Sequence, residues 1–336
     1  MANLNGINTR DNAAAIRAIL YSGVLRTQLE PELQMMKYVD VITDFPDGDS
    51  WQDVEIGSAT VRDYTEGEDV VFDGLEIGTR TFEINKYKTS AHFVSEKFLQ
   101  DSYLSAQIWG KLPALEARAI YADLEASILS EHRNMQKAGD ANVIGGYRHR
   151  FIAGADADAA MQQAGYLTPL DFTYASLALT AAGYTGPRIA IVPLYQEYAI
   201  AANKRLVNSL SYNPKWEGIV ATGVSSGMQF VFNINGFDVY TSNFTDTVTE
   251  KLPLREGATQ HTATNAGVAQ LFINQPDRRP WRLAWRMMPK FESQWNMVAR
   301  QEECVTVGRY GLGAGDTANL VSILCAASSE STFVNA

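Results

Sequence analysis

A long alternating stretch in the first third of the chain constrains the fold most. Residues 51–88 alternate between apolar and polar with period two, and a polar turn at 65–68 divides the stretch into two arms. This pattern predicts a long two-stranded β-hairpin. An isolated hairpin is at best marginally stable in water, and this one is too polar to form a core. We therefore expect it to reach outward to a complementary partner. Its charged residues include Glu55, Asp63, Glu66, Glu68, Asp69, Asp73, Glu76 and Glu83, against Arg62 and Arg80.

One helix is predicted before this hairpin, and a long helix with a short helical piece is predicted after it. Residues 12–29 carry apolar side chains at helical spacing and predict a short amphipathic helix, followed by an arm with turn chemistry. The strongest helix signal runs from 112 to about 138, with Pro113 near the first turn, where proline is tolerated. At 1.5 Å per residue this helix would be roughly 40 Å long, a spine along one face of a domain. A short helical piece around 93–107 precedes it.

Residues 168–285 predict a separate α/β unit. A helix begins at 168–171 and ends near Gly183, the apolar strand 188–192 follows, and Pro193 opens a second helix through Arg205. Strands 229–234 and 237–240 are joined by Asn235 and Gly236, a pair typical of tight hairpin turns. From 285 onward the chain alternates again, and we expect these strands to return beside the long helix.

Composition excludes several classes of protein. The 336 residues are 46% hydrophobic, enough for a substantial core. Lys and Arg total 28 against 38 Asp and Glu, and the net charge of -10 argues against non-specific wrapping of nucleic acid. The sequence has no apolar run of membrane-spanning length and no signal-peptide pattern, so we expect no membrane partner and synthesis in the cytoplasm. Cys304 and Cys325 are interpreted as small buried hydrophobes.

Catalytic spacings are missing as well. The four histidines are scattered without zinc-ligand spacing, and the glycines of 311–316 do not keep the nucleotide-binding pattern. The sequence has no P-loop lysine and no nucleophile elbow. We expect no catalytic, cofactor or metal site. A small-molecule enzyme built on 168–285 stays an alternative, which a pocket with convergent polar groups would support.

The order of these elements resembles the major capsid proteins of tailed bacteriophages, the Johnson fold. Residues 70–84 resemble the extended loop of that family, 188–195 resemble a strand and helix start of its axial domain, and 236–243 are similar to a recurrent stretch of the same domain. The short N-terminal region and the loop spacing look most like capsids of short-tailed phages. The resemblance implies an α+β fold with the following parts: an N-terminal arm with the short helix at 1–50, the extended loop at 51–88, a peripheral domain with the spine helix at 89–160, an axial domain at 161–284, and return strands of the peripheral domain at 285–336.

The function implied by this resemblance is structural. Such subunits form pentamers and hexamers that tile an icosahedral shell, the virion capsid, around the phage genome. The implied partners are further copies of the chain, a separate scaffolding protein during assembly, the portal, and packaged double-stranded DNA bound without sequence specificity. Assembly would take place in the cytoplasm of the bacterial host. An encapsulin, which shares the fold and packages protein cargo, is an alternative.

The resemblance also places contacts between subunits. Some family members are locked by an isopeptide bond from a lysine in the extended loop, but this chain has no lysine between Trp51 and Asn85, so we expect a non-covalent shell. The acidic hairpin suggests a basic surface on a neighbour, and the stretch 277–286 is the densest cationic candidate. An equal alternative is that its arginines are solvated or cap their own domain. The predicted contact residues are Arg62, Asp63, Glu66, Glu68, Asp69, Arg278, Arg279 and Arg282. The helix at 12–29 either packs on a peripheral domain or binds the scaffolding protein.

Overall fold

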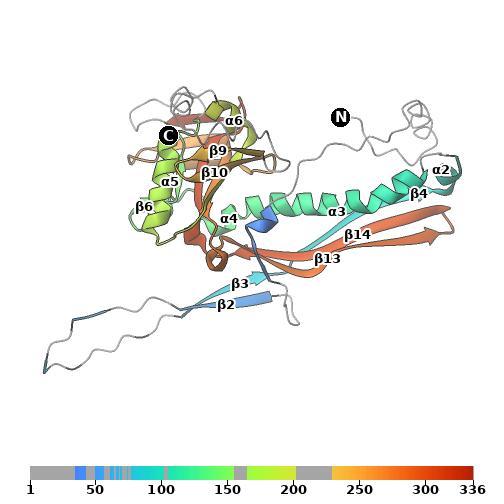
Figure 1. The fold of residues 1–336 in the computed structure, drawn as a ribbon, viewed down its shortest axis with the longest axis horizontal. Helices are drawn as coiled ribbons and strands as arrows, with labels where there is room; N and C mark the ends of the chain where they lie inside the picture. The colour runs from blue at the N-terminus through green and yellow to red at the C-terminus, as the bar shows by residue number, and fades with distance from the viewer. Residues whose placement is uncertain are drawn as a thin grey trace.

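The computed structural model of the chain describes residues 35–42, 50–56, 61–63, 66–67, 69, 74, 77–101, 105–154, 165–201 and 229–335. These residues form two sheet-based units joined by a long helix, and a two-stranded ribbon that projects away from both (Figure 1). The predicted helix at 12–29 and position Glu68 lie outside the described residues.

The elongated unit is a four-stranded sheet in the order β1-β13-β14-β4. The strands β13 (Trp281–Asn296) and β14 (Gln301–Ala314) form a long antiparallel hairpin, and β4 (Lys86–Ser95) adds to β14 antiparallel. The short β1 (Asp40–Ile42) runs parallel to the start of β13, after a 3-10 turn η3 (Met35–Lys37). The helix α3 (Ser105–Ser130) lies along this sheet (Figure 1). Its 26 residues extend about 39 Å.

The long helix is present, but its predicted bounds are wrong. It begins at Ser105, so that Pro113 lies inside it, and the helical path continues past Ser130 only as the short α4 (His132–Met135). Packing holds the helix across the proline, because Leu112 contacts Val94 and Phe98 in one apolar cluster. The helical piece predicted at 93–107 is also partly wrong. Residues through Ser95 belong to β4, where they complete the ladder with β14, and α2 (Glu96–Asp101) follows.

The second unit is an eight-stranded mixed sheet. Its main path has the order β7-β15-β12-β8-β10-β9, and β11 and β16 pair with further lengths of β12. The helices α5 (Pro169–Ala181) and α6 (Leu194–Ala201) pack on it. The strands are β7 (Arg150–Ile152), β8 (Arg188–Pro193), β9 (Gln229–Ile234), β10 (Phe237–Ser242), β11 (Thr247–Pro253), β12 (Gln260–Ile273), β15 (Val321–Ala326) and β16 (Thr332–Asn335); β5 (Val143–Ile144) and β6 (Tyr147–Arg148) form a small separate ladder, and η4 (Pro276–Arg278) and η5 (Thr317–Asn319) are 3-10 turns.

Short-range signals located the elements of this unit well. Asn235 and Gly236 join β9 to β10 with φ values of 49° and 83°, the left-handed conformation that a tight hairpin turn requires. A capping box between Thr168 and Asp171 opens α5. The predicted strand at 188–192 is β8. The second helix is confirmed as far as Ala201, and its predicted continuation lies outside the described residues.

The return of the C-terminal strands is only partly as expected. The strands β13 and β14 do lie beside α3, and β13 already begins at Trp281. In contrast, β15 and β16 pair with β12 in the eight-stranded sheet. All six residues of β15 are buried, as in a central strand that is covered on both faces. The expectation that the whole segment 285–336 returns beside the long helix is therefore wrong for its last two strands.

Candidate interaction surfaces

The ribbon is exposed along its described length. The strands β2 (Ser50–Ile56) and β3 (Ile77–Glu83) pair antiparallel, which confirms the predicted hairpin, although residues 86–88 belong to β4 and not to the hairpin. Every side chain described between residues 50 and 83 is exposed, including Val54 at 62% and Ile77 at 63%. The described side chains of the two paired strands lie on one face, and a two-stranded ribbon with an exposed face lacks the packing that stabilises a sheet. It is therefore a surface that needs a cover.

The base of the ribbon is anchored on β14. Gly311 allows this approach, because a Cβ atom there would lie 2.6 Å from the backbone oxygen of Glu83 and 2.9 Å from the Cα of Ile84. The side chain of Ile84 also packs with Ala284 of β13. Beyond this anchor the ribbon extends away from the sheet (Figure 1). The predicted contact residues Arg62, Asp63, Glu66 and Asp69 are all exposed on it.

The cationic stretch finds partners within its own chain. The guanidinium of Arg279 donates a hydrogen bond of 2.7 Å to the backbone oxygen of Val39, and Arg282 lies 3.5 Å from the carboxylate of Asp40. The guanidinium of Arg278 lies 5.9 Å from the ring centre of Tyr184. The contacts of Arg279 and Arg282 fasten residues 35–42 to the start of β13. A role of the three arginines in binding a neighbour stays a prediction.

A polar seam joins α3 to the sheet. The buried carboxylate of Glu116 accepts a hydrogen bond of 2.7 Å from the hydroxyl of Thr306 and contacts His92 Nδ1 at 2.7 Å. Two helical turns further along α3, Asp123 accepts a hydrogen bond of 3.0 Å from the Tyr310 hydroxyl and forms an ion pair with Lys88 at 3.0 Å. Sequence reasoning missed this seam, because helical periodicity marks apolar residues and gives no signal for polar partners in distant strands.

Three ion pairs hold β11 and its flanks in place. The carboxylate of Asp171 lies 2.8 Å from Arg255, Glu250 lies 2.7 Å from Arg150, and Asp246 accepts a 2.7 Å bond from Arg133. Asp246 also contacts the buried His132 at 3.1 Å. These pairs tie α5, β7 and α4 to one edge of the eight-stranded sheet.

The electrostatics of these pairs differ with burial. Burial raises the pKa of Asp171, while its hydrogen bonds to Thr168 and its pairing with Arg255 oppose this rise. At Asp246 burial also acts to raise the pKa, but the hydrogen bonds from His132 and Arg133 prevail, so the pKa is lowered. Both pairs are structural bridges between elements distant in sequence.

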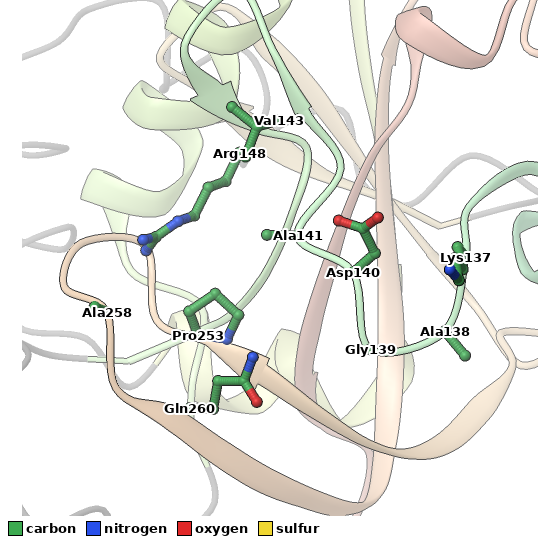
Figure 2. A pocket seen from close by; sticks show the side chains of 10 residues that line it. All are labelled: Lys137, Ala138, Gly139, Asp140, Ala141, Val143, Arg148, Pro253, Ala258 and Gln260. Carbon is green, nitrogen blue, oxygen red and sulfur yellow. The ribbon is translucent and has the colours of Figure 1, made fainter.

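A surface hollow of about 580 Å³ lies beside β11, lined by Lys137, Ala138, Gly139, Asp140, Ala141, Val143, Arg148, Pro253, Ala258 and Gln260 (Figure 2). In Figure 2 Arg148 points toward the loop that carries Ala258, whereas Lys137 lies at the opposite end of the hollow. The Arg148 guanidinium donates to the backbone oxygen of Leu254 at 2.6 Å, so it holds that loop. The polar groups do not converge on a common point, and the hollow gives no support to a small-molecule enzyme.

In the described part of the chain, no group of three His, Cys, Asp or Glu side chains is arranged to hold a metal ion. Among the helices of the same described residues, none has the length and apolar character needed to cross a membrane. Both cysteines are buried and free, and burial raises the pKa of the Cys304 thiol to about 11.

The comparisons with known proteins give a single clear result. Neither a protein-family model nor a curated protein sequence matches the chain. Among solved structures, the capsid of cyanophage P-SCSP1u matches with a TM-score of 0.65 and 13% identity, covering 91% of this chain and 92% of that one. The mature capsid of bacteriophage PhiM1 matches with a TM-score of 0.61 and 11% identity, covering 90% of each chain. The capsid of an empty GTA particle matches with a TM-score of 0.57 and 12% identity, covering 93% and 98%.

These matches extend over the elongated unit, the eight-stranded unit and the long helix together, since they cover about nine tenths of the chain. The predicted α+β class is confirmed, because helices and strands both contribute to the two units. At identities this low the likeness concerns the architecture of the backbone. The chain has the fold of phage capsid subunits.

Proposed function

We propose that the chain is a major capsid protein, which self-assembles as pentamers and hexamers into the icosahedral shell of a tailed bacteriophage. The observation that carries the proposal is the ribbon β2–β3, whose described side chains are all exposed, in a chain that has the fold of phage capsid subunits. A ribbon of this kind gains stability when another surface covers it. In a shell of identical subunits, every ribbon has a neighbour of the same kind available.

The finer parts of the proposal follow from the resemblance noted in the sequence. The eight-stranded unit, which includes β7, β15 and β16 besides strands of 161–284, surrounds the capsomer axis, and the spine helix belongs to a peripheral domain. The shell encloses double-stranded DNA without sequence-specific contacts, which agrees with the net charge of -10. A separate scaffolding protein and a portal take part in assembly in the bacterial cytoplasm. The short-tailed subtype stays a prediction.

The contact between subunits is proposed to be non-covalent and partly electrostatic. The exposed acidic residues Asp63, Glu66 and Asp69 lie on the projecting ribbon, where a neighbour can reach them. Arg278, Arg279 and Arg282 are the proposed cationic partners; Arg278 is exposed, and Arg279 and Arg282 are half-buried. Exposed charge pairs contribute about 0 to 1 kcal/mol each, so most of the contact must come from other surfaces.

Electron microscopy of the purified protein, alone and with a candidate scaffolding protein, tests the proposal. We expect closed shells with pentameric and hexameric capsomers. A protein that stays monomeric under every condition contradicts it. Particles that contain protein cargo in place of DNA when isolated from the native source would favour the encapsulin-like alternative, and portal and terminase genes beside the gene would favour the phage.

A further inference from the structure

The junction between the long helix and the eight-stranded unit contains a row of buried polar side chains. Gln270 of β12 stands directly opposite Ser322 of β15, and Ser322 in turn stands opposite Arg150 of β7. Because residues opposite each other in a sheet point to the same face, the three side chains form one row across three adjacent strands. At most 1% of each residue is exposed. Polar groups buried in this way need hydrogen-bond partners.

The end of the long helix and the segment after it cover this row. The Gln270 amide donates a hydrogen bond to the backbone oxygen of Leu129, in the last turn of α3. The Arg150 guanidinium donates one of 2.6 Å to the backbone oxygen of Lys137, just after α4. Beside these bonds the helix packs with apolar side chains of the same sheet, among them Phe272. The polar row therefore lies in a region of low dielectric constant, where an unpaired polar atom is costly.

Two more buried polar side chains meet next to the row. The Gln136 amide and the His149 Nδ1 lie 3.0 Å and 3.3 Å from one backbone oxygen, that of Leu320. This carbonyl is two residues before Ser322, whose own backbone nitrogen donates to the backbone oxygen of His149 at 2.8 Å. Gln136 and His149 are 2% and 0% exposed. We call Gln136, His149, Arg150, Gln270 and Ser322 the junction residues.

Each junction residue keeps one buried polar atom that finds no hydrogen-bond partner among the described residues. These atoms are the Oε1 of Gln136 and of Gln270, the Nε2 of His149, the Nε of Arg150 and the Oγ of Ser322. Native proteins leave few buried polar atoms unpaired, and an ordered water molecule is a common partner where the protein supplies none. Five such atoms on neighbouring side chains indicate a shared ligand.

The hydrogen-bonding types of these atoms select the ligand. A carbonyl can only accept, so the Nδ1 of His149 carries the proton and the Nε2 of the neutral ring is an acceptor. Burial lowers the pKa of His149 and keeps the ring neutral. With the two glutamine oxygens, three acceptors stand against the Arg150 Nε–H donor and the Ser322 hydroxyl, which can do either. An anion would add acceptors, and a cation would meet the charge of Arg150. Water supplies two donors and two acceptors.

We propose that the junction residues form a buried water-binding site, through which the end of the long helix is joined to the eight-stranded unit. Bound water accepts from the Arg150 Nε and donates to the acceptors of Gln136, His149 and Gln270. The surface hollow lies next to this site, because Lys137 lines the hollow and its backbone oxygen accepts from Arg150 (Figure 2). We expect water to exchange through the hollow. The site belongs to the folded subunit, so the inference does not depend on the proposed function.

An experimental structure at a resolution that shows ordered water tests the site directly. We expect density for water within hydrogen-bond distance, about 2.7 to 3.2 Å, of at least two of the five unpaired atoms. Junction residues that bond directly to one another, with no density between them, overturn the inference. Density for a metal ion or an anion at this place overturns it as well.

The Ser322→Ala variant gives a second arm. If the hydroxyl binds water, its removal loses a hydrogen bond, and the equilibrium constant of unfolding should rise about fivefold. If the hydroxyl is buried without a partner, its removal makes the protein more stable. The matched control is Ser331→Ala, because the buried Ser331 hydroxyl donates to the backbone oxygen of Asn265 at 2.6 Å and calibrates the loss of one such bond. Urea denaturation compares both variants with the wild type, and a Ser322→Ala protein that is equally or more stable than the wild type overturns the inference.

Discussion

The guanidinium of Arg255 lies 2.8 Å from the carboxylate of Asp171, and both side chains are buried at the start of α5. The two residues are separated by 84 positions in the chain. The same carboxylate caps the helix by accepting from the backbone and the hydroxyl of Thr168. One buried charge therefore fixes both the beginning of a helix and the loop that follows β11.

Removing the cation from this pair is expected to destabilise the eight-stranded unit. The Arg255→Met variant leaves the Asp171 carboxylate buried without its partner, which costs about 3 to 5 kcal/mol of unfolding free energy. Urea denaturation followed by circular dichroism measures the loss. The double variant Arg255→Met and Asp171→Asn should recover part of it, because the amide still accepts from Thr168. An Arg255→Met subunit as stable as the wild type contradicts the prediction.

The buried His149 is expected to make stability depend on pH. Burial lowers its pKa, and the opposing hydrogen bond to the Leu320 carbonyl does not restore it. The folded state therefore binds a proton less readily than the unfolded state, whose histidine pKa is about 6.5. The contribution of neutral His149 to the free energy of unfolding is fully present above about pH 6.5. It is lost as the pH decreases below this value, by at most about 1.4 kcal/mol per pH unit. Denaturation midpoints between pH 8 and 5 measure this slope, and His149→Gln should reduce it; an unchanged slope would refute the role of His149.

Gly311 is expected to tolerate no side chain. The Gly311→Ala methyl group would collide with the backbone of Glu83 and Ile84, so the base of the ribbon must shift, at a cost of about 1 to 3 kcal/mol. Gly308→Ala on the same strand is the control, because its Cβ would meet Ile120 at 3.4 Å, close to ordinary contact. Thermal unfolding and particle yield compare the two variants. Equal behaviour of both would show that the ribbon does not depend on this anchor.

Reversing the charge of the ribbon tip is expected to impair assembly. The change Glu66→Lys with Glu68→Lys should leave the subunit folded, since Glu66 is exposed, and reduce the yield of particles. The control is Glu330→Lys, a reversal at an exposed position near the C-terminal end. Sedimentation separates particles from free subunits. Particles formed normally by the tip variant would count against an acidic contact.

Mature particles are expected to dissociate into monomers on a denaturing gel. The segment between Trp51 and Asn85 has no lysine, so the ribbon lacks the amine that an isopeptide bond requires. A single band at the mass of the monomer, 37.0 kDa, is the expected result. A ladder of covalent oligomers under the same conditions would contradict a non-covalent shell.

Some elements were predictable because their causes are local. The turn at Asn235 and Gly236 needs positive φ, and the cap of α5 needs Thr168 and Asp171 three residues apart. The strands of the ribbon are marked by the alternation of apolar and polar residues. The ribbon as a candidate interaction surface was also predictable from local sequence. The sequence showed that the ribbon is acidic and needs a cover, since both follow from its own residues.

Other features depend on segments that meet only in the folded chain. The start of α3 before Pro113 rests on the packing of Leu112 against β4, and the place of β15 rests on its pairing with β12. The partners of Arg279 and Arg282 lie some 240 residues earlier in the chain.

The sequence by itself thus determined that this chain builds a projecting hairpin, a long helix and an α/β unit, because turn chemistry, capping and periodicity act over a few residues. Only the tertiary structure decided which face of the β4–β14 sheet is covered. That choice depends on Glu116 and Asp123 meeting Thr306 and Tyr310 across nearly 190 positions, which leaves alternate residues such as Tyr87 and Phe93 on the exposed face. A period-two pattern marks two faces of a strand, and the contacts of the folded chain select the one that faces inward.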